Sequence, residues 1–101
     1  MREFYHGRGR RTQARRRALE RRWRAVWVAL GDALAQLGLA YLEIGQRLGR
    51  ARMARRAGGI LVKAAGYYLE AGLGRKAASI NRLIERCRRA WLRHEAAEGF
   101  A

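Results

Sequence analysis

Residues 26–48, VWVALGDALAQLGLAYLEIGQRL, decide the fold of this chain. Together with the residues just before them, they place apolar side chains at steps of three and four. These are Leu19, Trp23, Val26, Leu30, Leu34, Leu37, Tyr41, Ile44 and Leu48. Their mean spacing of about 3.6 residues is that of one face of an α-helix. We therefore predict one long helix over residues 13–48, with Thr12 as its N-cap.

The other faces of the same segment are apolar too. Between residues 26 and 44 the stripe is widened by Trp27, Val28, Leu39 and Leu42. A helix that is apolar on every side is expected to be buried on every side. Half of the 101 residues are hydrophobic, which is more than a thin core needs, so we expect some apolar surface to be buried between subunits.

Three glycines punctuate this helix at intervals of seven residues, at Gly31, Gly38 and Gly45. Each costs roughly 1 kcal/mol of helix propensity relative to alanine. They lie along one edge of the apolar stripe. They mark either the close approach of a second helix or a break in this one, and the sequence leaves both open.

The rest of the chain is also predicted to be helical, because proline is absent and only glycines interrupt it. We expect a basic helix at about 50–57 ending at Gly58-Gly59, a third helix at 60–71 closing at the turn 72–74, and a last helix. That last helix has an apolar face of Ala77, Ile80, Ile84, Cys87 and Trp91, opposite Arg82, Arg86, Arg89 and Arg93. The prediction is an all-α fold, with residues 1–11 an extended basic arm and residues 12–101 a single helical domain, in which a long N-terminal helix precedes a helical hairpin or small bundle.

The chain has a formal charge of +15, and its cations are 21 arginines and two lysines, Lys63 and Lys76. Arginine presents a planar fork of donors that matches phosphate in two-point contacts, although a GC-rich or heat-adapted source also favours it. Self-repulsion at this charge opposes compaction unless an anionic partner neutralises it. Polyphosphate backbones are the commonest such partner.

The sequence disfavours two classes of protein, secreted proteins held by disulfides and membrane-spanning proteins. Cys87 is the only cysteine, so the chain holds no internal disulfide. No apolar segment follows the basic N-terminus directly, and the first long apolar stretch contains Asp32, Gln36 and Glu43, so we predict neither a signal peptide nor a membrane span.

The residues that could carry catalysis are few, and we predict a protein that is not an enzyme and takes no cofactor or metal. His6 and His94 lie near the two ends, and no serine or cysteine stands in a nucleophile motif. Asp32, Glu43 and Glu70 lie among apolar residues. They are either buried acids or, as we favour, partners of arginines in the same or a neighbouring subunit.

Nucleic-acid binding has the strongest signal. Between residues 2 and 24 ten arginines stand against Glu3 and Glu20, and on a helix they cover most of the circumference except near Leu19 and Trp23. A second cluster, at 47–56, contains no acid, and a third lies at 86–93. The candidate binding residues are Arg8, Arg10, Arg11, Arg15, Arg16, Arg17, Arg21, Arg22, Arg24, Arg47, Arg50, Arg52, Arg55 and Arg56.

Polar readers of base edges are scarce, because Asn81 is the only asparagine. We therefore expect recognition of the phosphate backbone with little sequence preference. Phe4, Tyr5 and His6 beside the arginines of the arm either stack on bases or dock on a neighbouring subunit.

Two resemblances bear on these expectations. Leu34, Leu37, Gly38, Tyr41, Gly45 and Ala57 have the spacing of a tetratricopeptide repeat, although Arg50 stands where that repeat has a small residue and its terminal proline is missing. Such a likeness implies helix-hairpin packing and a role as an adaptor for an acidic protein.

By general type, the basic segment 8–24, the apolar segment 26–44 and the absence of proline make the chain similar to the major capsid proteins of filamentous DNA viruses of hyperthermophilic archaea. That resemblance implies a nucleocapsid protein whose dimers enclose double-stranded DNA in a virion. The alternative with the same chemistry is a cellular, nucleoid-type DNA-binding protein in the cytoplasm.

Overall fold

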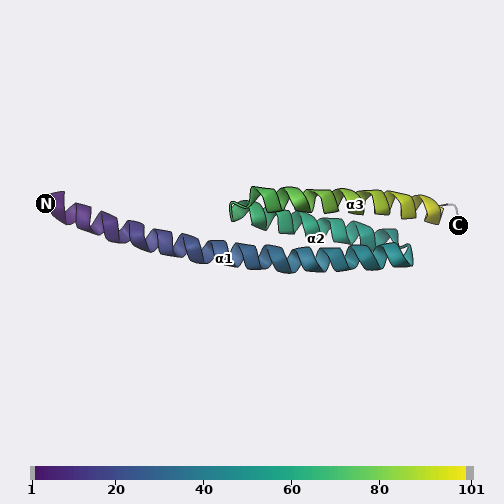
Figure 1. The fold of residues 1–101 in the computed structure, drawn as a ribbon, viewed down its shortest axis with the longest axis horizontal. Coiled ribbons are helices and arrows are strands. Elements are labelled where there is room, and N and C mark those ends of the chain that lie inside the picture. Colours follow the sequence, from purple (N-terminus) through teal and green to yellow (C-terminus); the bar gives the residue numbers. More distant parts are fainter. Residues whose placement is uncertain (1, 100–101) are drawn as a thin grey trace.

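The computed structural model describes the backbone of residues 2–99 and the side chains of residues 10–99, and its regular structure there is three α-helices with no strand. Helix α1 spans Arg2–Leu48, α2 spans Ala51–Glu70 and α3 spans Gly74–Gly99. The predicted all-α fold, with a long N-terminal helix followed by a helical hairpin, is confirmed (Figure 1).

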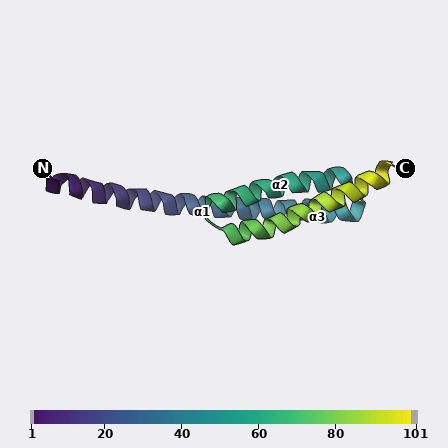
Figure 2. The same ribbon diagram turned by 90° about the horizontal axis from the view of Figure 1, so that it is seen from above.

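Successive helices run antiparallel, and α2 packs against both of the others, while α1 and α3 scarcely touch (Figures 1 and 2). The N-terminal half of α1 continues alone beyond the end of this bundle (Figure 1). The Cα atoms span 78 × 17 × 16 Å with a radius of gyration of 20.4 Å. A globular domain of this length would have a radius of about 13 Å, so the molecule is a rod.

Both turns end a helix in the same way. Gly49 has φ +63° and Gly72 has φ +76°, the left-handed conformation that glycine adopts without a steric penalty. The amide after each glycine donates to the carbonyl five residues earlier, from Arg50 to Gly45 at 2.9 Å and from Leu73 to Tyr68 at 2.8 Å. This is the Schellman arrangement, which satisfies carbonyls that the helix leaves without partners.

The glycine edge of α1 is the surface that packs on α2. Gly31, Gly38 and Gly45 are buried, and a methyl group at Gly38 would lie 2.6 Å from Cγ of Leu61. The close-approach interpretation of these glycines is therefore correct, and α1 does not break at any of them. Because the glycines lack side chains, the two backbones lie near enough for alanines to fill the interface.

The apolar stripe of α1 is not its core face, so the expected burial on every side of this helix is not reached within the single chain. Its residues are largely exposed, namely Leu19, Trp23, Val26, Leu30, Leu37, Ile44 and Leu48. Periodicity alone could not choose between the stripe and the glycine edge, since both repeat with the helix. The glycines, whose role the sequence left open, form the contact surface.

The expected break at Gly58-Gly59 is absent, because α2 is continuous from Ala51 to Glu70. Gly58 lies against α3, where a methyl group would be 3.5 Å from Cβ of Cys87. Packing on two neighbours along the whole length of α2 outweighs the helix propensity lost at two glycines, roughly 2 kcal/mol in all.

The core is thin and built mostly of small residues. The fully buried larger side chains are Leu42, Leu61 and Cys87, and the other core members include Tyr68, Ile80 and a series of alanines. On α3 the predicted apolar face turns inward: Ala77, Ile80 and Cys87 are buried, while Ile84 and Trp91 are partly buried. The carboxylate of Glu98 accepts a 3.4 Å hydrogen bond from the amide of Ala51, so the end of α3 caps the start of α2.

Residues 2–11 differ from the predicted extended arm, because α1 begins at Arg2 and Thr12 lies inside the helix and is no N-cap. The helix propensity lost at the two glycines of the first turns was not enough to end the helix. Residues 2–11 lie on the part of α1 that projects from the bundle, and they are helical.

Candidate nucleic-acid interface

The projecting half of α1 is a helix with arginines on most of its sides. Within residues 10–24 every side chain is exposed except that of Ala18, which is half-buried. The segment carries eight arginines and a single acid, Glu20: Arg10, Arg11, Arg15, Arg16, Arg17, Arg21, Arg22 and Arg24. At a rise of 1.5 Å per residue it extends for about 22 Å. The side that lacks arginine carries Leu19 and Trp23.

An aromatic stack marks the place where this helix leaves the bundle. The rings of Trp23 and Trp27 are stacked with centroids 5.7 Å apart, and Trp27 stacks on Tyr67 of α2 at 5.5 Å. Aromatic pairs of this kind contribute about 0.5–1.5 kcal/mol each beyond the area they bury. The stack therefore fixes the direction in which the basic helix points.

A polar cluster lies beside the stack and ties all three helices together. The Tyr68 hydroxyl of α2 donates a 2.5 Å hydrogen bond to Asp32 of α1, and Lys76 of α3 lies 3.6 Å from the same carboxylate. Burial, followed by the bond to Asp32, raises the pKa of Tyr68 to about 12. Asp32 is thus paired with a lysine and a tyrosine, whereas Glu43 and Glu70 are exposed.

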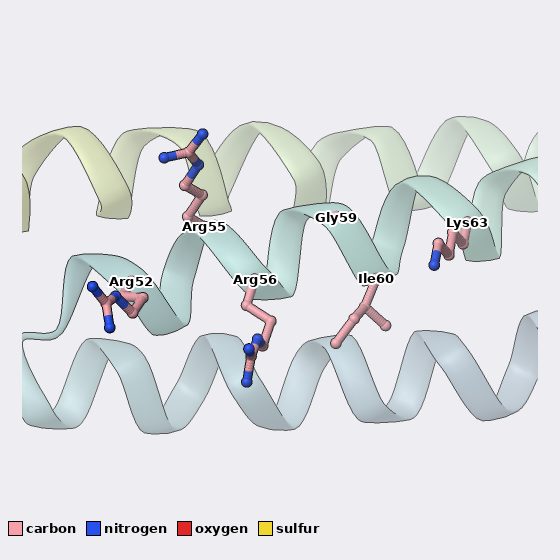
Figure 3. A pocket seen from close by; sticks show the side chains of 6 residues that line it. All are labelled: Arg52, Arg55, Arg56, Gly59, Ile60 and Lys63. Carbon is pink, nitrogen blue, oxygen red and sulfur yellow. The ribbon is translucent and has the colours of Figure 1, made fainter.

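A second cationic surface lies on the solvent side of α2. Arg52, Arg55, Arg56 and Lys63 surround a shallow open depression of about 460 Å³, whose floor is formed at Gly59 and Ile60 (Figure 3). The members follow the helical repeat, so they share one face, and no acid lines it. Lys63 was not predicted. Its spacing of seven from Arg56, two full turns, was the signal that sequence reasoning missed.

The side chains around this depression do not all point the same way. Arg55 reaches toward α3 and stands over the ring of Trp91, 5.2 Å from its centroid, whereas Arg56 points toward α1 (Figure 3). A guanidinium over an indole contributes about 0.5–1 kcal/mol at an exposed site. Arg55 therefore has a structural contact that Arg52 and Arg56 do not show.

The predicted arginines form two separate groups. Those of residues 10–24 lie outside the bundle, whereas Arg47 and Arg50 are exposed at the α1–α2 turn, at the far end of the rod, near the depression. Measured along α1, the midpoint of residues 10–24 lies about 45 Å from Arg47. Backbone atoms place Arg8 on the projecting helix. Its side chain, like those of Phe4, Tyr5 and His6, lies outside the described residues.

A third basic face lies on α3. Arg82, Arg86, Arg89 and Arg93 are all exposed on the side opposite its core residues, as the helical repeat predicts. Arg86 donates a 3.5 Å hydrogen bond to Gln46 of α1, and Arg88 pairs with Glu85 at 3.7 Å within α3. Each of the three helices thus presents cations to solvent.

The apolar part of α1 is long and apolar enough to cross a membrane by length and composition, and only 17 % of its most apolar 18 residues are buried in the bundle. A span would carry α2 with it, because α2 packs along the glycine edge of this segment. Placing Arg52, Arg56 and Lys63 in a bilayer would cost about 2.5–3.5 kcal/mol for each cation. A span that kept the bundle intact would have to offset this cost.

No group of three or more His, Cys, Asp or Glu side chains among the described residues could hold a metal ion. Cys87 is buried between α2 and α3, and that burial raises the pKa of its thiol, which disfavours the reactive thiolate. Comparison with known proteins gives no match to a family model, a curated protein or a solved structure.

Proposed function

We propose that this chain is a structural protein, not an enzyme, that coats double-stranded DNA through arginine–phosphate contacts without sequence preference. One observation carries the proposal. The projecting half of α1 exposes eight arginines against one acid, and no part of the described chain neutralises them.

A helix with this charge needs a polyanion to be stable. Like charges three and four residues apart destabilise an isolated helix, and helices without tertiary packing are marginal at this length. Phosphates lying on both sides of the segment remove that repulsion. Each contact also releases counterions from the nucleic acid, which adds to the affinity at low salt.

Geometry favours a DNA duplex over an RNA duplex. The major groove of B-DNA is about 12 Å wide and admits an α-helix, whereas that of A-form RNA is deep and narrow. A helix in the DNA groove has a phosphate backbone on each side. Arg15 and Arg21 point to different sides of the helix axis, so they can each contact one of the two strands.

The basic faces of α2 and α3 extend the contact beyond one groove. They lie on the bundle, away from the projecting helix, so one molecule can touch phosphates at separated points along a duplex or on two duplexes. This arrangement suits a coat, whose setting is either a virion of the filamentous type or a cellular nucleoid.

The proposal is tested by measuring binding to random-sequence double-stranded DNA across a salt series. We expect a steep linear fall of log K with log salt concentration. The triple variant Arg15→Gln, Arg17→Gln, Arg21→Gln should reduce the magnitude of that slope by about 2.7, since each lost phosphate contact removes about 0.9.

A matched control removes the same charge from α3 by Arg82→Gln, Arg89→Gln, Arg93→Gln, and it should change the slope less. Equal effects of the two triple variants would show that binding follows net charge alone and does not depend on the projecting helix. Weak binding of the wild-type chain at low salt would contradict the proposal and favour an acidic protein as the partner.

A further inference from the structure

The apolar stripe on α1 is an unpartnered surface in the single chain. Seven large side chains along it are between 39 and 59 % exposed, and they run from residue 19 to residue 48. They are Leu19, Trp23, Val26, Leu30, Leu37, Ile44 and Leu48. Exposed apolar surface of this extent on a soluble chain marks an interaction site.

The stripe contains a seven-residue repeat. Trp23, Leu30, Leu37 and Ile44 are spaced by seven, and a second series of Leu19, Val26, Ala33 and Ala40 is spaced by seven and offset by three. These are the a and d positions of a heptad, which we call the open seam. The glycine edge of the same helix also repeats every seven residues. One of these two faces is filled by α2, and the other has no partner among the described residues.

We propose that the open seam binds the open seam of a second copy of this chain, with the two α1 helices antiparallel. In that orientation each a position faces a d position of the partner, and each contact occurs twice about the two-fold axis. The facing pairs are Trp23 with Ala40, Leu30 with Ala33, Leu37 with Val26, and Ile44 with Leu19.

Two of the four pairs match a large residue with a small one. Trp23 opposite Ala40 and Leu30 opposite Ala33 keep the spacing of the two helices even, as interdigitated packing requires. In the parallel orientation Trp23 would face its own copy, as would Ala40. The seam would then be too wide at one end and empty at the other.

Charge favours the same orientation. Antiparallel helices bring Arg22 of one copy beside Glu43 of the other at both ends of the seam, and both residues are exposed in the single chain. The two projecting basic segments then lie about 44 Å apart, far beyond the Debye length of about 8–10 Å. A parallel pair would hold them side by side. Beyond the seam Arg16 would meet Arg47, so repulsion limits the overlap to the heptads.

The area is sufficient for a stable pair. The six large side chains of the open seam are about half exposed. They contribute on the order of 100 Å² each, or roughly 600 Å² per copy and ~1,200 Å² in total, which is within the range of specific interfaces. The projecting half of each α1 would gain a partner in the bundle half of the other copy. This inference concerns the protein without nucleic acid and does not depend on DNA binding.

The first test is the mass of the full chain in solution, free of nucleic acid, by sedimentation over a range of concentrations. We expect a dimer, and we expect Leu30→Gln with Leu37→Gln to yield a monomer that still unfolds cooperatively, with less helix because the projecting segment loses its partner. Val62→Gln with Leu69→Gln is the matched control, because both residues are exposed on α2, off the seam, and this variant should remain dimeric.

The second test fixes the orientation by disulfide formation in a Cys87→Ala background. A mixture of a Leu37→Cys chain and a Val26→Cys chain should form a linked heterodimer, whereas neither chain alone should link to itself, because identical positions lie about 16 Å apart in an antiparallel pair. Self-linking of the Leu37→Cys chain would overturn the orientation. A monomer at every concentration would overturn the proposal, and its binding to phospholipid vesicles through the same residues would assign the seam to a membrane surface.

Discussion

The position of α1 relative to α2 is determined by the missing side chain of single residues. At Gly38 an added methyl would lie 2.6 Å from Cγ and 2.7 Å from Cδ2 of Leu61, which is itself fully buried. At Gly66, four residues before the end of α2, the same methyl would meet nothing within 4 Å. Gly38 therefore allows the two helices to pack closely, whereas Gly66 makes no packing contact.

This contrast gives a direct prediction. Gly38→Ala should lower the free energy of unfolding by about 1–3 kcal/mol, because overpacking outweighs the gain in helix propensity. Gly66→Ala should raise it by about 0.5–1 kcal/mol, since only the propensity changes. Chemical denaturation followed by circular dichroism measures both. Stabilisation by both variants would show that α1 and α2 are farther apart than described here.

Tyr68 makes the stability of the bundle depend on alkaline pH. Its pKa is raised from 10.0 to about 12. Between these two pH values the Tyr68 hydroxyl is protonated in the folded state and ionised in the unfolded state. The stabilisation is complete below pH 10 and is lost as pH rises from 10 to 12. Over that window the unfolding free energy of the wild type should fall by about 1–3 kcal/mol more than that of Tyr68→Phe, which cannot ionise. Parallel pH profiles for the two proteins would contradict the assigned contact with Asp32.

At the scale of elements, the sequence predicted which segments are helical but not which faces meet. The end of α1 at Leu48, the turn at Gly72 and the inward face of α3 were all predicted, because apolar periodicity and glycine caps are local signals. The failures at Gly58-Gly59 and along the stripe have one cause. Whether a glycine interrupts a helix or admits a neighbour depends on the neighbour, and that information is not local.

In the candidate interface, too, local features were predictable from the sequence and features that depend on a neighbouring helix were not. Exposure of the arginines of residues 10–24 was predictable, since charge on nearly every side leaves no face to bury. Their isolation from the bundle was not, because it depends on α2 ending beside Trp27, where Tyr67 completes the stack. Likewise the seven-residue spacing of Arg56 and Lys63 is evident in the sequence. It places both residues on one face only if α2 is continuous between them.

At the scale of the whole molecule, charge and length together decide how chains can lie on DNA. A duplex carries one phosphate per about 1.7 Å of axis, so a formal charge of +15 is matched by about 25 Å of duplex. The molecule is 78 Å long. Chains lying along the duplex reach charge balance only when about three of them share each segment, which requires them to lie beside one another around the DNA.

A titration of double-stranded DNA with the protein at low salt should therefore saturate near one chain per 7–8 base pairs, the number that carries about 15 phosphates. Tryptophan fluorescence reports the endpoint, because Trp23 lies among the arginines and contributes to it together with Trp27 and Trp91. Negative-stain microscopy of the saturated mixture should show filaments of even width. An endpoint near one chain per 23 base pairs would mean that chains lie end to end without overlapping, as the 78 Å length allows, and would contradict a coat. Saturation at the predicted ratio with irregular clusters in place of filaments would favour a nucleoid role over a virion, because charge balance alone does not impose a regular lattice.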